Sequence, residues 1–239
     1  MTGLPLVGVL ACQKLRANGT TYSRVNDNLA EQLSAHAGVA TVLIGATRPD
    51  LAASVLSRLD GLVLPGSGSF VHPRHFGAEP VDGREYDEGR DAAAFALLAA
   101  ADLPVLASCR GMQELAVHHG AALGVVPDSG VAHRVKGPDK WLPAHGIEVR
   151  PGGALTDLVD GTGFEVNSQH SDHVAEVPDG MRVEAVAPDG VVEAISVGWP
   201  ERFMLGIQWH FEHGTTELDR RILSEFGQRC RAWAKRRIA

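Results

Sequence analysis

The sequence predicts an α/β fold: a mostly parallel central sheet with helices on both faces, and an additional small antiparallel region. In the first half, short apolar runs alternate with longer helical patterns, as in parallel sheets covered on both faces. The second half changes to strand-like runs separated by turns such as Pro188-Asp189-Gly190, which predicts antiparallel pairing. The chain has 239 residues and shows no internal repeat or linker, so we expect a single domain, residues 1–239.

The apolar periodicity places each element. Buried strands are predicted in the first half at Leu6–Ala11, Val39–Ile44, Gly61–Leu64 and Pro104–Ala107. Helices are predicted between them at Tyr22–Ala37, Arg48–Arg58 and Asp91–Ala101. Strands are predicted in the second half at Gly146–Arg150, Met181–Ala187, Val191–Val197 and Phe203–Gln208, before a closing helix from Glu217 to Lys235.

Charge and cysteine content exclude several classes of protein. The formal net charge is -7, so no basic footprint for nucleic acid is present. Cys12, Cys109 and Cys230 are odd in number and far apart, which predicts no disulfide framework and favours a reducing compartment. The N-terminal residues lack a charged segment followed by a long apolar stretch, so neither a signal peptide nor a membrane span is predicted. We therefore expect a cytoplasmic protein.

Cys109 lies where a buried strand is followed directly by a helix, in the pattern Ala107-Ser108-Cys109-Arg110-Gly111. Ligands of open α/β sheets bind outside the carboxyl ends of the strands. Small flanking residues permit the sharp turn of a nucleophile elbow. The helix N-terminus favours the thiolate, which is the attacking species, and Arg110 adds positive potential. Cys109 is thus a candidate nucleophile, whereas Cys12 and Cys230 are expected to be core residues.

His210 and Glu212 are candidates for a base and the group that orients it. In extended chain, residues two apart point to the same side, so the carboxylate is expected to hold one ring nitrogen of His210. The other nitrogen is then free to face Cys109, as in a catalytic triad.

No metal or cofactor site is predicted. The histidine pairs His72/His75, His118/His119 and His170/His173 lack a second-ligand pattern such as His-Glu-x-x-His or paired Cys-x-x-Cys. The turn Pro65–Ser69 is glycine-rich but lacks the Lys-Ser/Thr ending of a P-loop, which favours an oxyanion-binding turn over a phosphate site.

Several blocks of sequence together resemble one known family. They are Leu62–Ser67, Ser108–Glu114, Val166–His170, Ala187–Ala194 and Leu205–Glu212. In this order, and over nearly the whole chain, they resemble the γ-glutamyl-γ-aminobutyrate hydrolases of the class I glutamine amidotransferase-like superfamily. The resemblance implies a flavodoxin-like α/β fold and hydrolysis of a γ-glutamyl amide to glutamate and a free amine through a thioester, in polyamine or putrescine breakdown, without a cofactor.

The resemblance also implies residue roles. Cys109, His210 and Glu212 match the catalytic triad, and the backbone amides of Arg110 and of Gly66-Ser67 match the oxyanion hole.

Substrate-binding roles are implied for a second set. Gln113 matches a contact to the glutamyl group, and Asn167, Ser168, Gln169 and His170 match a segment that lines the glutamyl pocket. Ser67–Gly77, with His72 and His75, matches a loop beside the active site.

Two departures from the family pattern bear on this interpretation. Phe211 stands where proline usually separates the histidine and glutamate, and proline would fix the backbone there. Gln169, Ser171 and Asp172 differ from the commoner pocket residues, so the amine specificity is open. A glutaminase that passes ammonia to a partner synthase and a non-catalytic binding protein of the same fold remain alternatives. A homodimer is the commonest soluble oligomer and is the expected assembly, if any.

Overall fold

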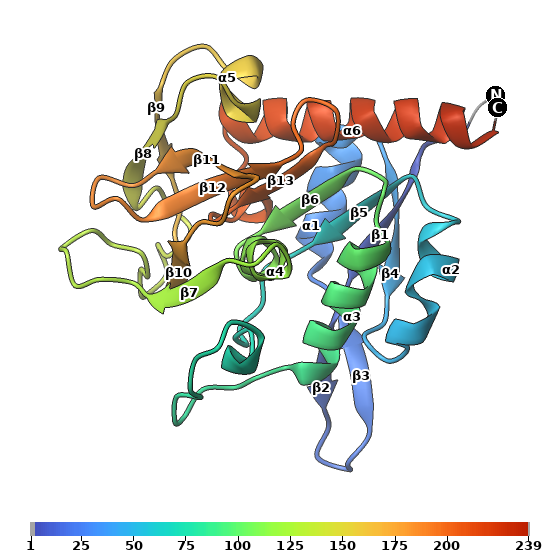
Figure 1. Ribbon diagram of the computed structural model, residues 1–239, viewed down its shortest axis with the longest axis horizontal. Coiled ribbons are helices and arrows are strands. Elements are labelled where there is room, and N and C mark those ends of the chain that lie inside the picture. Colours follow the sequence, from blue (N-terminus) through green and yellow to red (C-terminus); the bar gives the residue numbers. More distant parts are fainter. Residues whose placement is uncertain (1–2, 239) are drawn as a thin grey trace.

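The computed structural model describes residues 3–238, whose main feature is a nine-stranded sheet (Figure 1). Five neighbouring strands of this sheet are parallel, and we call them the parallel half. They are, in spatial order, β4 (Ala40–Ile44), β1 (Leu6–Leu10), β5 (Gly61–Leu64), β6 (Val105–Ser108) and β13 (Met204–Ile207). The predicted parallel sheet is confirmed.

The sheet continues with antiparallel strands, which we call the antiparallel half. They are β12 (Val192–Val197), β11 (Met181–Val186), β8 (His145–Val149) and β9 (Gly163–Val166). Two separate two-stranded sheets pair β7 (Ala122–Val125) with β10 (Asp172–Glu176), and β2 (Cys12–Leu15) with β3 (Thr21–Arg24). The antiparallel region thus extends the central sheet beyond β13.

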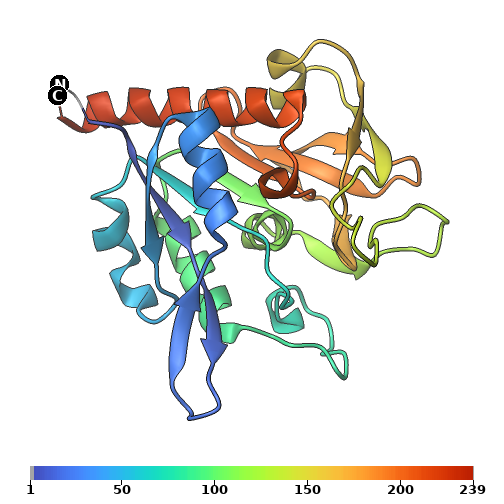
Figure 2. The ribbon, with the colours of Figure 1, turned by 180° about the vertical axis from the view of Figure 1, so that it is seen from behind.

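Helices cover both faces of the sheet. One face carries α1 (Asp27–Gln32), the π-helical turn η1 (Leu33–Ala37) and α6 (Glu217–Ile238), seen in front in Figure 2. The other carries α2 (Ala52–Leu56), α3 (Glu88–Ala100) and α4 (Arg110–His118). A short helix, α5 (Ala154–Leu158), packs beside α6.

The strands form two hydrophobic cores because successive side chains point to opposite faces. Val7 and Val63 pack with Phe226 of α6, whereas Leu62 and Leu64 pack against the α2–α4 side. All five side chains are fully buried, and burial of such apolar surface is the main stabilising contribution to a fold of this kind.

One predicted helix begins later than expected. Residues 22–24 of the predicted helix Tyr22–Ala37 lie in strand β3, which pairs with β2, and the helix begins at Asp27. The hairpin turns at Gly19, whose φ of 82° favours glycine. The helical spacing of Val25, Leu29 and Leu33 therefore identified the helix but placed its start too early.

Short segments were missed altogether, including β7, β9, β10 and α5. Three 3₁₀ turns complete the described chain: η2 (Pro49–Leu51), η3 (Pro73–His75) and η4 (Phe211–His213).

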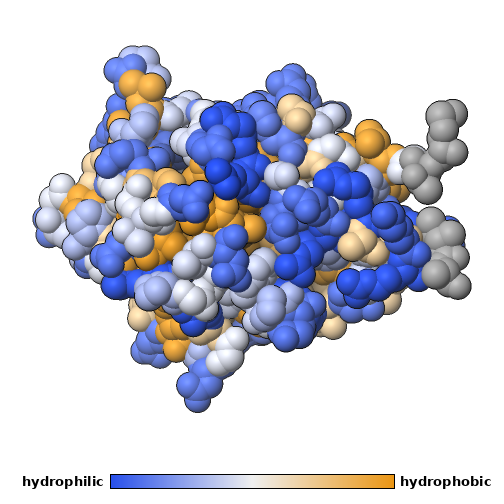
Figure 3. Space-filling view, turned by 90° about the horizontal axis from the view of Figure 1, so that it is seen from above, coloured by the Kyte–Doolittle hydropathy of each residue, from blue (hydrophilic) through white to orange (hydrophobic). Residues whose placement is uncertain are grey.

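Seen from above, over α6, the surface is mainly hydrophilic with smaller hydrophobic areas (Figure 3). Within residues 3–238, no helix is both long and apolar enough to span a membrane.

Candidate active site

Cys109 occupies a strained turn between β6 and α4. Its φ of 49° and ψ of -112° make it the only non-glycine residue with positive φ in the described part of the chain. Such backbone conformations cost on the order of 1–3 kcal/mol and persist only where the surroundings impose them. The backbone N–H of Cys109 donates to the carbonyl of Ile207 in β13 at 2.8 Å. The thiol is thus held at the carboxyl end of the sheet and at the N-terminus of α4, as a nucleophile elbow requires.

Gly111 allows this turn to lie against the sheet. A Cβ at this position would be 1.8 Å from the carbonyl oxygen of Leu64, at the end of β5. Any side chain here would push α4 away from the sheet, so the small residue in the elbow pattern has a direct steric cause.

His210 and Glu212 form the predicted pair. The Nδ1 atom of His210 lies 2.8 Å from Oε1 of Glu212, and both side chains are buried. The predicted contact is present, but its expected cause was wrong: Glu212 lies in the 3₁₀ turn η4 and not in extended chain.

Two features fix this pair without the usual proline. Asn167 binds the His210 backbone twice, since its Oδ1 accepts from the His210 N–H and its Nδ2 donates to the His210 carbonyl, both at 2.9 Å. Phe211 is fully buried in the core on the α6 side. Phe211 therefore anchors the turn by packing, and Asn167 anchors it by hydrogen bonds.

The charges around His210 favour its protonated form. Burial lowers the pKa of His210, but the neighbouring Cys109 and the charge and hydrogen bond of Glu212 outweigh it, so the pKa lies well above its ordinary value. Burial raises the pKa of Glu212, but the charge and hydrogen bond of His210 outweigh it and hold that pKa below its usual range. Both shifts favour an imidazolium paired with the Glu212 carboxylate.

The Gly66-Ser67 turn lies directly against this pair. A Cβ on Gly66 would be 2.6 Å from Cε1 of His210 and 3.3 Å from Cβ of Cys109. Ser67 Oγ lies 2.8 Å from Ser69 Oγ and accepts a hydrogen bond from the thiol of Cys12 at 3.2 Å. The absence of a side chain on Gly66 leaves the space between the thiol and the imidazole open.

Buried ion pairs support the turn from behind. Arg90 donates to both oxygens of Glu114, at 2.9 and 3.1 Å, and to the carbonyl of Pro65. Arg110 donates to Asp91 at 2.5 Å and to Ser69 Oγ at 2.6 Å. The Arg110 side chain is thus compensated by a carboxylate behind the turn, while its backbone N–H is in the first turn of α4, where such groups have no helical partner.

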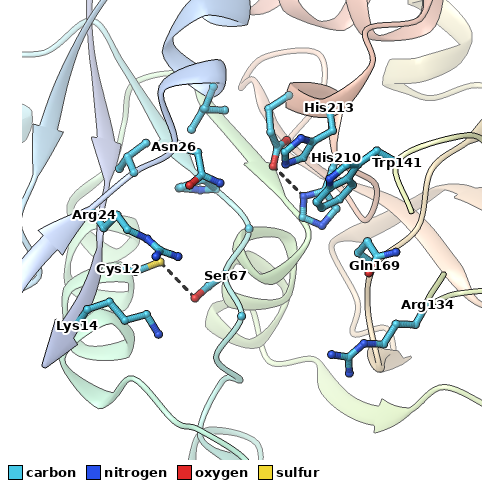
Figure 4. Close-up of a pocket in the computed structure, with 16 residues that line it drawn as sticks. Cys12, Lys14, Arg24, Asn26, Ser67, Arg134, Trp141, Gln169, His210 and His213 are labelled. Carbon is cyan, nitrogen blue, oxygen red and sulfur yellow. Dashed lines mark hydrogen bonds and ion pairs between the residues drawn. The ribbon is translucent and has the colours of Figure 1, made fainter. Parts of the chain in front are cut away.

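Two adjoining cavities open onto these residues and share Ser67, Gly68, Arg134 and Gln169. We name them by the catalytic candidate each contains. The Cys109 cavity is also lined by Ser69, Phe70, Arg110, Gln113, His170, Ser171 and Asp172. The His210 cavity is also lined by Cys12, Lys14, Arg24, Val25, Asn26, Leu29, Pro65, Trp141, Glu212 and His213 (Figure 4).

The residues expected to bind substrate are divided by the structure. Gln113, Gln169 and His170 line the Cys109 cavity, and Gln113 donates to the carbonyl of Asp172 at 2.9 Å. Asn167 and Ser168 lie behind it: Asn167 binds the His210 backbone, and Ser168 donates to the carbonyl of His133 at 2.9 Å.

The two histidines of the Ser67–Gly77 loop lie outside both cavities. His72 accepts a hydrogen bond from the Arg74 N–H, and His75 lies 3.7 Å from Asp91.

Sequence reasoning missed several residues of the His210 cavity. Cys12, expected in the core, is half-buried on β2 and accepts from Arg90 at 2.9 Å. Trp141 stacks on His213, with ring centroids 3.6 Å apart, and meets His210 edge-on at 5.1 Å (Figure 4). Lys14 and Arg24 come from the β2–β3 hairpin. None of these positions carries a local motif, so only the assembled fold identifies them.

Comparison with known proteins places this site in a family. The model of the peptidase C26 family matches residues 5–212. The chain belongs to the peptidase C26 family. Its catalytic candidates all lie within the matched region.

Individual relatives extend over nearly the whole chain. The chain is 34% identical to the γ-glutamyl-γ-aminobutyrate hydrolase PuuD of Escherichia coli K12, over 95% of this chain and 93% of that protein. It is 28% identical to protein NtpR of Enterococcus hirae, over 94% and 99%. The crystal structure of a Thermoplasma acidophilum protein named for a component of GMP synthase superposes with a TM-score of 0.70 at 18% identity, covering 100% of both chains, which shows a shared fold.

Proposed function

We propose that this peptidase C26 member is a cysteine hydrolase that cleaves a γ-glutamyl amide, with Cys109 as nucleophile, His210 as base and Glu212 as the orienting group. The observation that carries the proposal is the strained Cys109 turn beside a buried His210–Glu212 pair. The raised pKa of His210 supports it, because an imidazolium between thiolate and carboxylate is the resting state of such a site.

The reaction is acyl transfer to water. The Cys109 thiolate attacks the amide carbon, and the oxyanion is stabilised by the backbone amides of Arg110 and of the Gly66-Ser67 turn. The imidazolium of His210 gives its proton to the leaving nitrogen, and the free amine departs from a Cys109 thioester. Neutral His210 then takes a proton from water, which attacks the thioester and releases glutamate.

The charges of the two cavities support a substrate with a carboxylate at each end. Arg134 borders both cavities, and Gln113 and Gln169 border the Cys109 cavity, where we place the glutamyl group. Lys14 and Arg24 line the His210 cavity (Figure 4), which we take as the leaving-group side of the site. Lys14 is paired with Glu85 at 2.5 Å, so Arg24 is the better placed of the two to bind a substrate carboxylate. γ-Glutamyl-γ-aminobutyrate, the substrate in the name of the E. coli relative, carries these two carboxylates. We therefore place the carboxylate of γ-aminobutyrate near Arg24.

Glutamate release by the wild-type protein and by Cys109→Ala tests the reaction. We expect release from γ-glutamyl-γ-aminobutyrate by the wild type and a loss of at least about 10³-fold in the variant. No release from any γ-glutamyl amide would contradict a stand-alone hydrolase. Release from glutamine only in the presence of a synthase would support the partner-dependent glutaminase.

Arg24→Ala tests the placement of the amine. We expect KM for γ-glutamyl-γ-aminobutyrate to rise about tenfold, as for loss of one partly exposed charge contact, and KM for uncharged γ-glutamyl-butylamide to stay unchanged. Arg16→Ala is the matched control, because Arg16 lies in the same hairpin against Tyr22 and outside the cavity. Equal effects of Arg24→Ala on both substrates would refute the placement.

The single-domain, cytoplasmic and homodimeric expectations remain predictions.

A further inference from the structure

Three histidines and a glutamate meet at a buried point beside the Cys109 cavity. His133 comes from the loop after β7, His145 begins β8, His170 precedes β10, and Glu193 lies in β12. All four side chains are buried, and one nitrogen or oxygen atom of each lies within 4.8 Å of the others. Four segments that are distant in sequence therefore direct potential ligand atoms to one place.

Four of the six distances between the ligand atoms match a four-coordinate metal. Oε1 of Glu193 lies 3.2 Å from Nδ1 of His133, 3.5 Å from Nε2 of His145 and 3.4 Å from Nε2 of His170. Nδ1 of His133 and Nε2 of His170 are 3.2 Å apart. Ligand atoms about 2.0–2.1 Å from a tetrahedral zinc ion are separated from one another by about 3.3 Å.

The outward nitrogens of the three rings fix their tautomers. Nδ1 of His145 bonds the carbonyl of Gly146, and Nδ1 of His170 bonds the carbonyl of Asp172, each at 3.0 Å. A carbonyl oxygen only accepts, so each Nδ1 carries the hydrogen and each Nε2 presents a lone pair to the cluster. Metal-binding histidines show this outer contact as a rule.

His133 follows the same pattern through a carboxylate. Its Nε2 lies 3.1 Å from Oδ2 of Asp189, which also accepts from Ser129. The inward Nδ1 of His133 is therefore the unprotonated atom in the neutral ring. Three lone pairs and a carboxylate then face one another, which is unfavourable unless a cation lies among them.

The lack of hydrogen-bond partners for several inward atoms also indicates a bound cation. Nε2 of His145 and both carboxylate oxygens of Glu193 are buried without a hydrogen-bond partner among the described residues. Buried polar atoms of this kind are rare, because each loses its water without compensation. A metal bond satisfies the two atoms that face the cluster, His145 Nε2 and Glu193 Oε1.

We propose that His133, His145, His170 and Glu193 bind one structural transition-metal ion, and that this ion is zinc. Imidazole and carboxylate ligands suit zinc, and four protein ligands in a closed, buried geometry are the mark of a structural site and leave no position for a reacting water. The ion joins the loop after β7 to β8 and β12. It also fixes His170, which lines the Cys109 cavity, and so the loop that carries Asn167 and Gln169.

Metal analysis of untagged wild-type protein tests this inference independently of the proposed reaction. We expect about one zinc ion per chain by mass spectrometry of the purified protein. Removing the ion with a chelator is expected to lower Tm by about 10 °C, and adding zinc to restore it. Cobalt-substituted protein should show the strong visible absorption of a four-coordinate ion.

Variants separate a specific site from metal on the surface. His145→Asn and Glu193→Gln each remove one ligand and are expected to abolish stoichiometric zinc binding. Asp189→Asn removes only an outer contact and is expected to weaken zinc affinity about 10–100-fold. His173→Asn is the matched control, since His173 is three residues from His170 but outside the cluster, and should keep the full zinc content.

The same measurements can also overturn the zinc site. If wild-type protein contains no metal, binds no added zinc and melts at the same temperature with and without a chelator, the inference is wrong. A shared proton then joins the histidines to Glu193, since Oε1 of Glu193 lies within 3.5 Å of a ring nitrogen of all three. Zinc retained in His145→Asn would equally overturn the site. If the variants do not fold, the wild-type metal content and chelator response decide alone.

Discussion

The two halves of the sheet hold their parts of the candidate site by different means. In the parallel half, Cys109 is placed by its own backbone: a strand end, a strained turn and a glycine contact with Leu64. In the antiparallel half, the loop Asn167–His170 is placed by the buried side chains of Asn167 and Ser168, which bind the backbone of distant segments. His210 follows β13, the last parallel strand, and is held by both halves.

This difference indicates where the site tolerates change. Backbone packing of the kind around Cys109 depends on shape, so it responds to volume and steric strain. A buried polar network depends on every partner being satisfied, so it responds to the loss of single hydrogen bonds and to pH. The following three comparisons test each kind of support, from the largest expected effect to the smallest.

Glu212→Gln probes the charged contact between His210 and its carboxylate. The pKa of Glu212 is lowered, so its contribution to stability is complete above its ordinary value of 4.5 and is lost as pH falls through the folded value. The pKa of His210 is raised, so its contribution is complete below 6.5 and is lost as pH rises through the folded value.

Between pH 4.5 and 6.5, the free energy of unfolding of the wild type should therefore exceed that of Glu212→Gln by about 3 kcal/mol. The difference should be smaller at lower and at higher pH. Urea denaturation of both proteins across pH measures the difference. A difference that does not vary with pH would show that the pair is not charged.

Asn167→Ala removes both hydrogen bonds to the His210 backbone. We expect a loss of about 2 kcal/mol in the free energy of unfolding, because a buried N–H and carbonyl lose their partners. We also expect kcat for γ-glutamyl-γ-aminobutyrate to fall by a larger factor than KM changes, since His210 is displaced. Ser168→Ala is the control: its hydroxyl binds the His133 carbonyl and not His210, so it should lose stability without a matching loss of kcat.

Cys109→Gly and Cys109→Ala compare the strain at the turn. Both lack the thiol and are expected to be inactive, but glycine adopts a φ of 49° without steric cost. We expect Cys109→Gly to be about 1 kcal/mol more stable than Cys109→Ala, after the greater freedom of glycine in the unfolded chain is included. Thermal denaturation measures this, and a less stable glycine variant would show that the turn is unstrained.

Much of the parallel half was predictable from sequence because its signals are local. Continuous apolar runs identified β1, β4, β5 and β6, and the small residues around Cys109 identified the turn. The contact between His210 and Glu212 was also predicted, although the chain achieves it through the turn η4 that contains Phe211.

The polar side of the site was not predictable in the same way. Arg24 was assigned to a helix, and its place in the cavity depends on the β2–β3 hairpin. Trp141 comes from a loop, and its stacking on His213 depends on how that loop folds back. The cluster around Glu193 draws on four segments, so pairs such as His170 and His173, close in sequence, gave no indication of it.

The position of Trp141 has a consequence for fluorescence measurements on this protein. The chain has four tryptophans, and this one stacks on His213 and meets His210 edge to face. An imidazolium quenches indole fluorescence more strongly than neutral imidazole does. Protonation of His213 or His210 is therefore expected to lower the emission of Trp141, so its fluorescence offers a way to follow the charge on these two histidines.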